Sequence, residues 1–316
     1  MEMKKVLKVI LIRSGILLSL LVVLIMAIKT MVQEGPLEPR KQDKILAILK
    51  AESFQEYDQH LRGIKDGMVF NGLQYNTKVY ALPSLIRDAN LVYSMNPCQT
   101  EEILQRQGHD FPYKMIGYSY IKETQENYTG IYCDLDWQEI LPVYQKIIPG
   151  MKRIGVIYTQ GSCDGEKQAL SMKSIIDMRP ALSIYIQTLD HYGEDIDQIL
   201  LELFGQVDAI YAVSRDPVIQ AHLEDIAELC IDRKVPLLGG GIFGPEKGAL
   251  ASLAYDPYRV GRKGADIIRA VEQSERMSKV PIVTLKPELY LNLRTAYSLG
   301  IEIPSSLRKI AQKVYN

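Results

Sequence analysis

Residues 152–165 read KRIGVIYTQGSCDG, and this stretch decides the fold. The apolar run at 154–158 is followed by a turn of small polar residues, which includes Gly161 and Ser162, and by a helical pattern that begins near Asp164. This order is typical of a buried parallel strand, its carboxyl-end loop and the next helix. Ligands of doubly wound sheets bind at the carboxyl ends of the strands, because helix N-termini leave free N–H groups there. The loop is therefore a candidate wall of a ligand site.

A second copy of this pattern lies about a hundred residues earlier, too far away for a solenoid repeat of about 20–50 residues. Residues 44–49, KILAIL, run into a short polar turn, and a helix is expected from about Gln55 to Met68. Two such starts predict two α/β lobes rather than one. The other expected strands lie at 76–80, 90–93, 113–118, 127–131, 182–186, 207–213 and 235–238.

The first residues of the chain have the pattern of a membrane anchor. Residues 1–8 carry three lysines, and the charge-free apolar run at 14–28 is flanked by Arg13 and Lys29. With the apolar residues on either side, this run reaches the roughly 20 residues that cross a bilayer. We expect a cytoplasmic basic stub and transmembrane signal anchor at 1–33, then a linker at 34–43. A cleaved signal peptide and a buried helix are the alternatives, although no A-x-A-like cleavage site is found nearby.

Composition narrows the classes of function. The formal net charge is -1, with Lys+Arg 37 against Asp+Glu 38, so no electrostatic argument supports a nucleic-acid partner. The histidines are scattered and the cysteines show no C-x-x-C, which speaks against a metal site. A disulfide and buried free thiols are both open for the four cysteines. No G-x-S-x-G, H-E-x-x-H or P-loop sequence supports an enzyme. The apolar run also occupies the place where a repressor would carry its helix-turn-helix.

The first lobe has two further predicted features. Residues 81–89 are too few for a helix of average length, so this lobe lacks one covering helix. A helix is expected from Thr100 to Gln107, with Thr100 as its cap.

The ordered segments KRIGVIYTQG, GQVDAIYAVSRD, KVPLLGG, KGALASLAYDPYRVGRKGADI and LYLNLRTAYSLGIEIP resemble the substrate-binding proteins of ABC transporters, in the family that includes the tryptophan- and tyrosine-uptake type. The resemblance covers residues 127–304 well and 44–72 loosely. It implies a type I periplasmic-binding fold, with a ligand between two lobes and three hinge crossings. The crossings implied lie near 133–137, after Tyr255 and Asp256, and at Val280. The first lobe would then contain 44–134 and 257–279, and the second 135–256 and 280–316.

The loops at the carboxyl ends of the strands supply the candidate ligand-binding residues, with no catalytic residue, metal or cofactor expected. Ser162 and the N–H groups that follow it suit a carboxylate, and Asp216 or Asp256 suits an ammonium group. Asp216 as an ordinary helix cap, Asp256 as a hinge residue and the tyrosines as wall residues are the alternatives. The glycines at 239–241 lack the Lys and Ser/Thr of a P-loop, which favours a flexible turn. The candidates are Glu52, Ser53, Tyr57, Ser94, Asn96, Tyr118, Tyr120, Gly161, Ser162, Ser214, Asp216, Gly240, Tyr255 and Asp256.

The resemblance and the anchor together lead to one expected function. We expect an extracytoplasmic solute-binding protein, held by one span in the cytoplasmic membrane, that captures an amino acid or small organic acid for an ABC-type importer. Its partners would be the ligand, the membrane and a permease. The alternative is a ligand sensor of the same fold whose partner is a signalling membrane protein.

Overall fold

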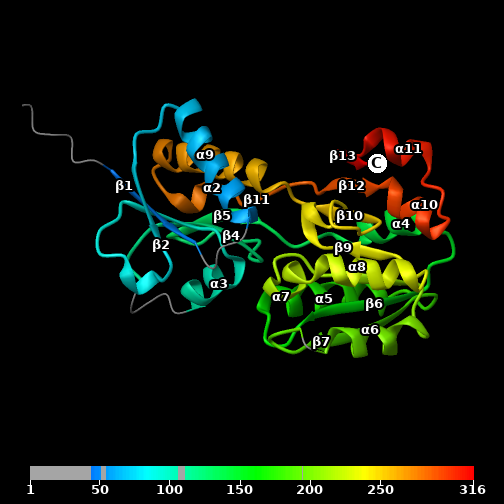
Figure 1. Ribbon diagram of the computed structural model, residues 1–316. Coiled ribbons are helices and arrows are strands. Elements are labelled where there is room, and N and C mark those ends of the chain that lie inside the picture. Colours follow the sequence, from blue (N-terminus) through cyan, green and yellow to red (C-terminus); the bar gives the residue numbers. More distant parts are fainter. Residues whose placement is uncertain (1–43, 51–54, 106–110, 194) are drawn as a thin grey trace, which may run out of the picture. The chain divides into compact units, whose positions relative to one another are not determined.

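The computed structural model describes residues 44–50, 55–105, 111–193 and 195–316, which form two α/β lobes, each built on its own sheet (Figure 1). This arrangement confirms the two-lobe α/β class expected from the sequence. The predicted anchor at 1–33 and linker at 34–43 lie outside the described residues. Within those residues, no helix combines the length and the apolar character that crossing a membrane requires.

The first lobe is built on a parallel sheet in the order β11-β5-β4-β3-β1-β2. Side chains alternate between the faces along a strand. Leu46 and Ile48 of β1 therefore pack with α2 and α9, whereas Ala47 and Leu49 pack with α3. Both faces are covered, which explains the continuous apolar runs of the sequence. The elements are β1 (Ile45–Leu49), α2 (Gln55–Phe70), β2 (Asn76–Tyr80), η1 (Pro83–Leu85), β3 (Leu91–Ser94), α3 (Pro97–Gln105), β4 (Met115–Ser119), β5 (Tyr128–Tyr132), α9 (Pro257–Gln273), η3 (Met277–Lys279) and β11 (Val283–Thr284).

Helices α2 and α9 approach closely because glycines line their contact. A Cβ atom on Gly63 would lie 2.1 Å from the Tyr258 carbonyl oxygen, and one on Gly261 would lie 2.0 Å from the His60 carbonyl oxygen. No side chain fits at such distances, so the two backbones touch directly. This contact fixes the part of α2 that faces the second lobe.

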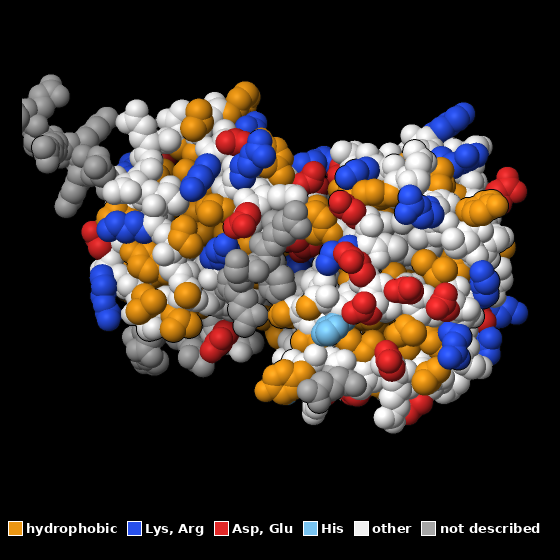
Figure 2. All heavy atoms as spheres, in the orientation of Figure 1, with side chains coloured by type: hydrophobic (Ala, Val, Ile, Leu, Met, Phe, Trp, Pro, Cys, Tyr) orange, Lys and Arg blue, Asp and Glu red, His pale blue; other side chains and the backbone are white. Residues whose placement is uncertain are grey.

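The second lobe has a mixed sheet in the order β13-β12-β10-β9-β8-β6-β7, in which β12 runs antiparallel to β10. Its buried strands β6 and β8 come from the apolar runs predicted above. On the face shown in Figure 2, acidic and basic side chains are interspersed, in keeping with the near-zero net charge. The elements are α4 (Trp137–Ile147), β6 (Arg153–Thr159), α5 (Cys163–Ile176), β7 (Ser183–Leu189), α6 (Ile196–Phe204), β8 (Ala209–Ala212), α7 (Pro217–Ala221), α8 (Leu223–Asp232), β9 (Leu237–Gly239), η2 (Gly241–Phe243), β10 (Ala251–Ala254), β12 (Glu288–Asn292), α10 (Leu293–Leu299), α11 (Ser305–Ile310) and β13 (Lys313–Tyr315).

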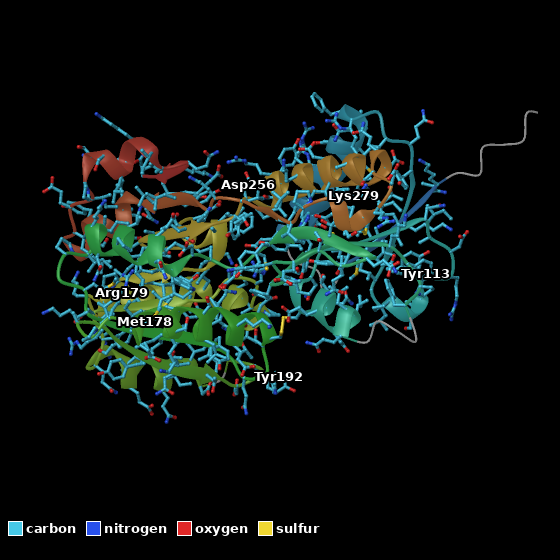
Figure 3. All side chains as sticks on the ribbon, turned by 180° about the vertical axis from the view of Figure 1, so that it is seen from behind. Tyr113, Met178, Arg179, Tyr192, Asp256 and Lys279 are labelled. Atoms are coloured by element: carbon cyan, nitrogen blue, oxygen red, sulfur yellow. A yellow bond between two sulfur atoms is a disulfide. The ribbon has the colours of Figure 1, made fainter. Side chains whose placement is uncertain are left out.

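The chain passes between the lobes in three places. It leaves β5 for α4 at 133–136, and it leaves β10 for α9 at Tyr255 and Asp256, the latter labelled in Figure 3. The third crossing differs from the expected one at Val280. Strand β11 still pairs with β5 of the first sheet, through Val283 and Ile131, so the crossing lies at 285–287. Val280 itself is buried in the first-lobe core.

The turn before α3 also differs from the prediction. The helix begins at Pro97, because the Asn96 side chain caps it by accepting the Gln99 N–H at 2.8 Å. Thr100 is fully buried and its hydroxyl donates to Ser94, so it is not the cap. Residues 81–89 contain only the short 3-10 turn η1, which confirms that no full helix covers this connection.

Cysteine pairing is settled within the described part of the chain, which contains all four cysteines. Cys98 of α3 and Cys163 of α5 form a disulfide, whereas Cys133 and Cys230 are buried free thiols. Since α3 belongs to the first lobe and α5 to the second, the disulfide is a covalent link between the lobes (Figure 3).

Candidate functional site

A cleft between the two lobes forms the candidate ligand site. Helix α2 contributes its amino-terminal turns, β3 and β4 contribute their carboxyl ends, and the second lobe contributes the loops after β8, β9 and β10. Residues of two interlobe crossings also face the space. The lining residues are Glu56, Tyr57, His60, Met95, Tyr118, Cys133, Leu135, Gln168, Ser214, Arg215, Gly241, Ala254, Tyr255, Pro257 and Val260.

Arg215 is held in the cleft by a strained backbone. Its φ is 59°, in the left-handed region that a residue with a Cβ atom rarely adopts. The residues on either side keep it there. Ser214 donates its N–H and its hydroxyl to the Gln168 Oε1, both at 3.1 Å. Strain that the surrounding bonds maintain is typical of a functional residue.

The Arg215 guanidinium reaches groups of both lobes. In the second lobe it forms an ion pair with Asp164 at 3.0 Å. In the first lobe it donates to the hydroxyls of Tyr120 at 3.0 Å and Tyr118 at 3.4 Å. The Tyr120 hydroxyl in turn donates to Asp164 Oδ1 at 2.5 Å, which closes the network. Arg215 therefore joins the lobes through bonds that water or a ligand is able to replace.

The cleft contains positive and negative groups in a poorly solvated space. Burial opposes the charge of Arg215, but Asp164 and the nearby tyrosines raise the pKa of its guanidinium well above the usual value. Burial raises the pKa of the Glu56 carboxyl, while Arg215 lowers it. Glu56 lies against the second lobe, since a Cβ atom on Gly241 would sit 2.5 Å from its Oε1. A ligand in the cleft thus meets a cation and a carboxyl group.

His60 adds a neutral polar group to the wall. Its Nε2 lies 2.9 Å from the Tyr93 hydroxyl, and its ring makes an edge contact with Tyr118 at a centroid distance of 5.8 Å. Burial, with a smaller effect of Arg215, lowers the pKa of His60 from 6.5 to about 3. The imidazole is therefore uncharged at neutral pH.

The family to which the chain belongs follows from comparison with known proteins. Residues 115–315 match the family described as ABC transporter substrate binding protein. The chain belongs to this family. A curated relative, a tyrosine-binding protein of Clostridioides difficile (strain R20291), is 23% identical over 177 residues, which are 55% of this chain and 49% of the relative. The chain thus matches about half the length of that relative.

Solved structures show the same fold for this substrate-binding protein. An ABC domain in complex with L-Trp from Streptococcus pneumonia aligns with a TM-score of 0.71 and 19% identity, over 86% of this chain and 99% of that one. A substrate-binding protein with adhesive properties from Clostridium difficile, in its ligand-free, open form, aligns with a TM-score of 0.66 and 16% identity, over 86% and 99%. At these identities the likeness establishes the type I periplasmic-binding fold.

Several predicted residues of this substrate-binding protein lie at the cleft. Tyr57, Tyr118, Ser214 and Tyr255 line it. Tyr120 belongs to the network of Arg215 and Asp164. Asn96 does not line the space, but its amide donates to the Tyr57 hydroxyl at 3.2 Å. Glu52 and Ser53 lie outside the described residues.

Asp216 is placed differently from the ammonium-binding role considered above. It is fully buried. Its Oδ2 accepts the Thr159 N–H at 2.8 Å, and its Oδ1 accepts the Thr159 hydroxyl at 2.6 Å and the Ile219 N–H at 3.2 Å. Both carboxylate oxygens are thus used by the protein, and the helix-capping interpretation is the one that the structure supports.

The other predicted residues support the walls rather than line them. Ser162 caps α5 and accepts the Gly165 N–H, beside exposed Gly161. Asp256 caps α9 by accepting the N–H groups of Tyr258 and Arg259. Ser94 is buried and bonded to Thr100, and Gly240 is a buried turn residue with φ 72°. None of these five predicted residues lines the cleft.

Sequence reasoning missed the charged residues that matter most. Arg215 stands between two residues that were named, and Glu56 precedes the named Tyr57. A rule that favours charged side chains in carboxyl-end loops would have found Arg215. Asp164, the ion-pair partner of Arg215, is predicted from the sequence only as the start of a helix. Across the described part of the chain, no group of His, Cys, Asp and Glu is arranged to hold a metal ion.

Proposed function

We propose that this substrate-binding protein captures a small amino acid or organic acid between its lobes and presents the closed form to the permease of an ABC-type importer. The observation that carries the proposal is the Arg215 guanidinium beside the Glu56 carboxyl group in an interlobe cleft with tyrosine walls. Arg215 suits a carboxylate through a forked contact, and Glu56 suits an ammonium group. The tyrosines suit a planar or apolar side chain.

The lobes are built to move relative to each other. The second-lobe core and the first-lobe cores consist of separate sets of buried side chains, and Tyr255 is the shared residue at their edge. Parting the lobes therefore leaves both cores intact. The chain crosses in short segments, the usual form of a hinge.

Binding of candidate ligands by the full chain tests this proposal. L-Tyrosine, L-tryptophan and simple organic acids are titrated calorimetrically and in thermal-shift assays, with and without dithiothreitol because a disulfide spans the lobes. A true ligand at about 100 times its dissociation constant adds roughly 2.7 kcal/mol of stability. Arg215→Lys keeps the charge but loses the forked geometry, and is expected to weaken binding of a carboxylate ligand about ten- to a hundredfold.

The matched control is Arg179→Lys, because Arg179 is a half-buried arginine of the second lobe that does not line the cleft and lies far from Asp256 of the second crossing in Figure 3. Equal affinity of the parent, Arg215→Lys and Arg179→Lys proteins would remove Arg215 from the site. Absence of binding to every amino acid and organic acid would reject the ligand class.

We also propose that the globular part lies outside the cytoplasm and is held by one uncleaved span at 1–33. The apolar run of the sequence supports this location, and so does the disulfide, because disulfides persist in oxidising compartments. The same tether favours a second candidate, a sensor that passes the closed state to a signalling membrane protein. Gene neighbours distinguish the two: a permease with an ATPase, or a kinase or cyclase.

A further inference from the structure

The disulfide between Cys98 and Cys163 lies where the lobes meet, away from the three crossings. Cys98 is in the first turn of α3 and Cys163 is the first residue of α5. One turn further along both helices, Glu101 and Lys167 form an ion pair at 2.8 Å. The two helices are thus tied twice, once covalently and once by charge.

The ligand cleft lies between this tie and the crossings. Cys133, Leu135 and Tyr255 of the crossing segments line it. Arg215 reaches from the cleft to Asp164, the residue next to Cys163. Rotation about the crossings would separate α3 from α5, so a covalent bond between these helices restrains that rotation.

The restrained cleft is largely filled by the protein's own side chains. The free space among them is about 30 Å³. A water molecule needs roughly 10–15 Å³ measured in this way, so the space admits about two waters. A ligand the size of an amino acid requires the lobes to separate or Arg215 to leave its network.

We propose that the Cys98–Cys163 disulfide is a redox gate: the oxidised protein keeps its lobes together over the filled cleft, and reduction lets them part and admit ligand. The gate rests on the proposed ligand cleft, but its main test requires no ligand. Other contacts of the described residues on this side of the cleft are non-covalent: Arg215 with Tyr118 and Tyr120, Tyr120 with Asp164, and Lys167 with Glu101. Water is able to replace each of them once the lobes part, whereas it cannot replace the disulfide.

The reduction is an ordinary thiol–disulfide exchange with a dithiol, such as a thioredoxin-like oxidoreductase or dithiothreitol. One thiolate of the dithiol attacks the Sγ of Cys163, the more exposed of the two residues, and Cys98 leaves as a thiolate. The second thiol of the dithiol then displaces Cys163, so that two electrons and two protons pass to the protein and the dithiol becomes a disulfide. Both cysteines lie in the first turn of a helix, which stabilises the leaving thiolate and favours exchange.

The rates at which the two free cysteines react with a thiol reagent test the proposal. Cys133 lines the cleft and is 2% exposed, and Cys230 is 0% exposed in the second-lobe core. The full chain, purified in detergent under oxidising conditions, is compared with its Cys98→Ser/Cys163→Ser double variant. Each protein is treated with iodoacetamide, and labelling of each cysteine is followed by peptide mass spectrometry.

We expect Cys133 to react about 5- to 150-fold faster in the double variant, the range of a typical coupling between two sites. Cys230 should stay slow in both proteins, because it reports unfolding rather than lobe separation. Dithiothreitol should accelerate Cys133 of the parent in the same way. Lys167→Met removes the ion pair with Glu101 and the contact of the ammonium group with the Tyr120 ring but keeps the disulfide, so Cys133 of the oxidised variant should stay protected.

Three results would overturn the gate: equal Cys133 rates in parent and double variant, parallel acceleration of Cys133 and Cys230, or labelling of Cys98 and Cys163 in the unreduced parent. Calorimetric titration with L-tyrosine and L-tryptophan is a separate arm. If Cys133 opens as expected but neither amino acid binds, the gate stands and the proposed ligand class is tested with other solutes.

Discussion

His60 makes the stability of the protein depend on pH in a way that one substitution isolates. Its ring is buried beside Tyr93 and Tyr118, and burial, followed by Arg215, lowers its pKa from 6.5 to about 3. The unfolded chain therefore binds a proton near pH 6.5, whereas the folded protein does not. Stability from the neutral ring is complete above pH 6.5 and is lost as the pH falls toward 3.

The magnitude follows from the two pKa values. One pKa unit corresponds to about 1.4 kcal/mol, so a group that changes from 6.5 to about 3 removes about 2 kcal/mol of unfolding free energy between pH 7 and pH 5. Glu56 acts in the opposite direction, because its raised pKa lets the folded state take up a proton on acidification. The pH dependence of the total unfolding free energy therefore combines both effects. The contribution of His60 is isolated by comparing the parent with a His60 variant.

The comparison is between the parent and His60→Gln, whose side-chain amide is also able to bond to Tyr93. Urea unfolding is measured at pH 7, 6 and 5. The variant is expected to be less stable at pH 7 but to lose about 2 kcal/mol less than the parent by pH 5. Parallel losses in the two proteins would show that His60 titrates normally and would refute the reasoning.

Three further predictions concern packing, capping and anchoring. Gly261→Ala places a methyl group 2.0 Å from the His60 carbonyl oxygen and should cost about 1–3 kcal/mol of unfolding free energy. Gly205→Ala is the control and should cost little, because a Cβ atom there meets nothing within 4 Å. Equal costs of the two substitutions would contradict the close contact between the helices. Asp216→Asn turns an amide toward the Thr159 N–H or hydroxyl and should lower the unfolding free energy by about 1–3 kcal/mol. The affinity for ligand should stay unchanged. Weaker ligand binding by a fully stable variant would show instead that Asp216 contacts the ligand. Full-length protein should remain in the membrane fraction after carbonate washing, and a soluble form that begins near residue 34 would argue against the anchor.

The lobes could be predicted from the sequence because their strands are local signals. A buried parallel strand is a continuous apolar run, and 44–49 and 154–158 show it plainly. The third crossing could not be placed in this way. Strand β11 has two residues and is defined by pairing Val283 with Ile131, a contact between segments far apart in the sequence.

The site was predicted less well, because position in a loop does not tell where a side chain points. Ser214 and Asp216 bond back to Gln168 and Thr159, which leaves Arg215 between them directed into the cleft. The disulfide was also beyond sequence reasoning. Cys98 and Cys163 belong to different lobes, so their pairing depends on how the lobes meet and not on spacing.

The contact between the lobes is polar, so a change of one covalent bond or the binding of one ligand would be enough to shift the equilibrium between joined and separated lobes. A hydrogen bond to a charged group that water replaces on opening contributes a net of about 1.5–3 kcal/mol. The network of Arg215, Asp164 and Tyr120 therefore holds the lobes by several kcal/mol, less than a shared apolar core would supply. Among the described residues, the partly buried Tyr255 is the one that packs against both cores. A ligand shifts such an equilibrium by the difference between its affinities for the two states. A carboxylate that takes the place of Asp164 on Arg215 would keep the cross-lobe bonds of the arginine while adding its own, so binding would favour the joined lobes.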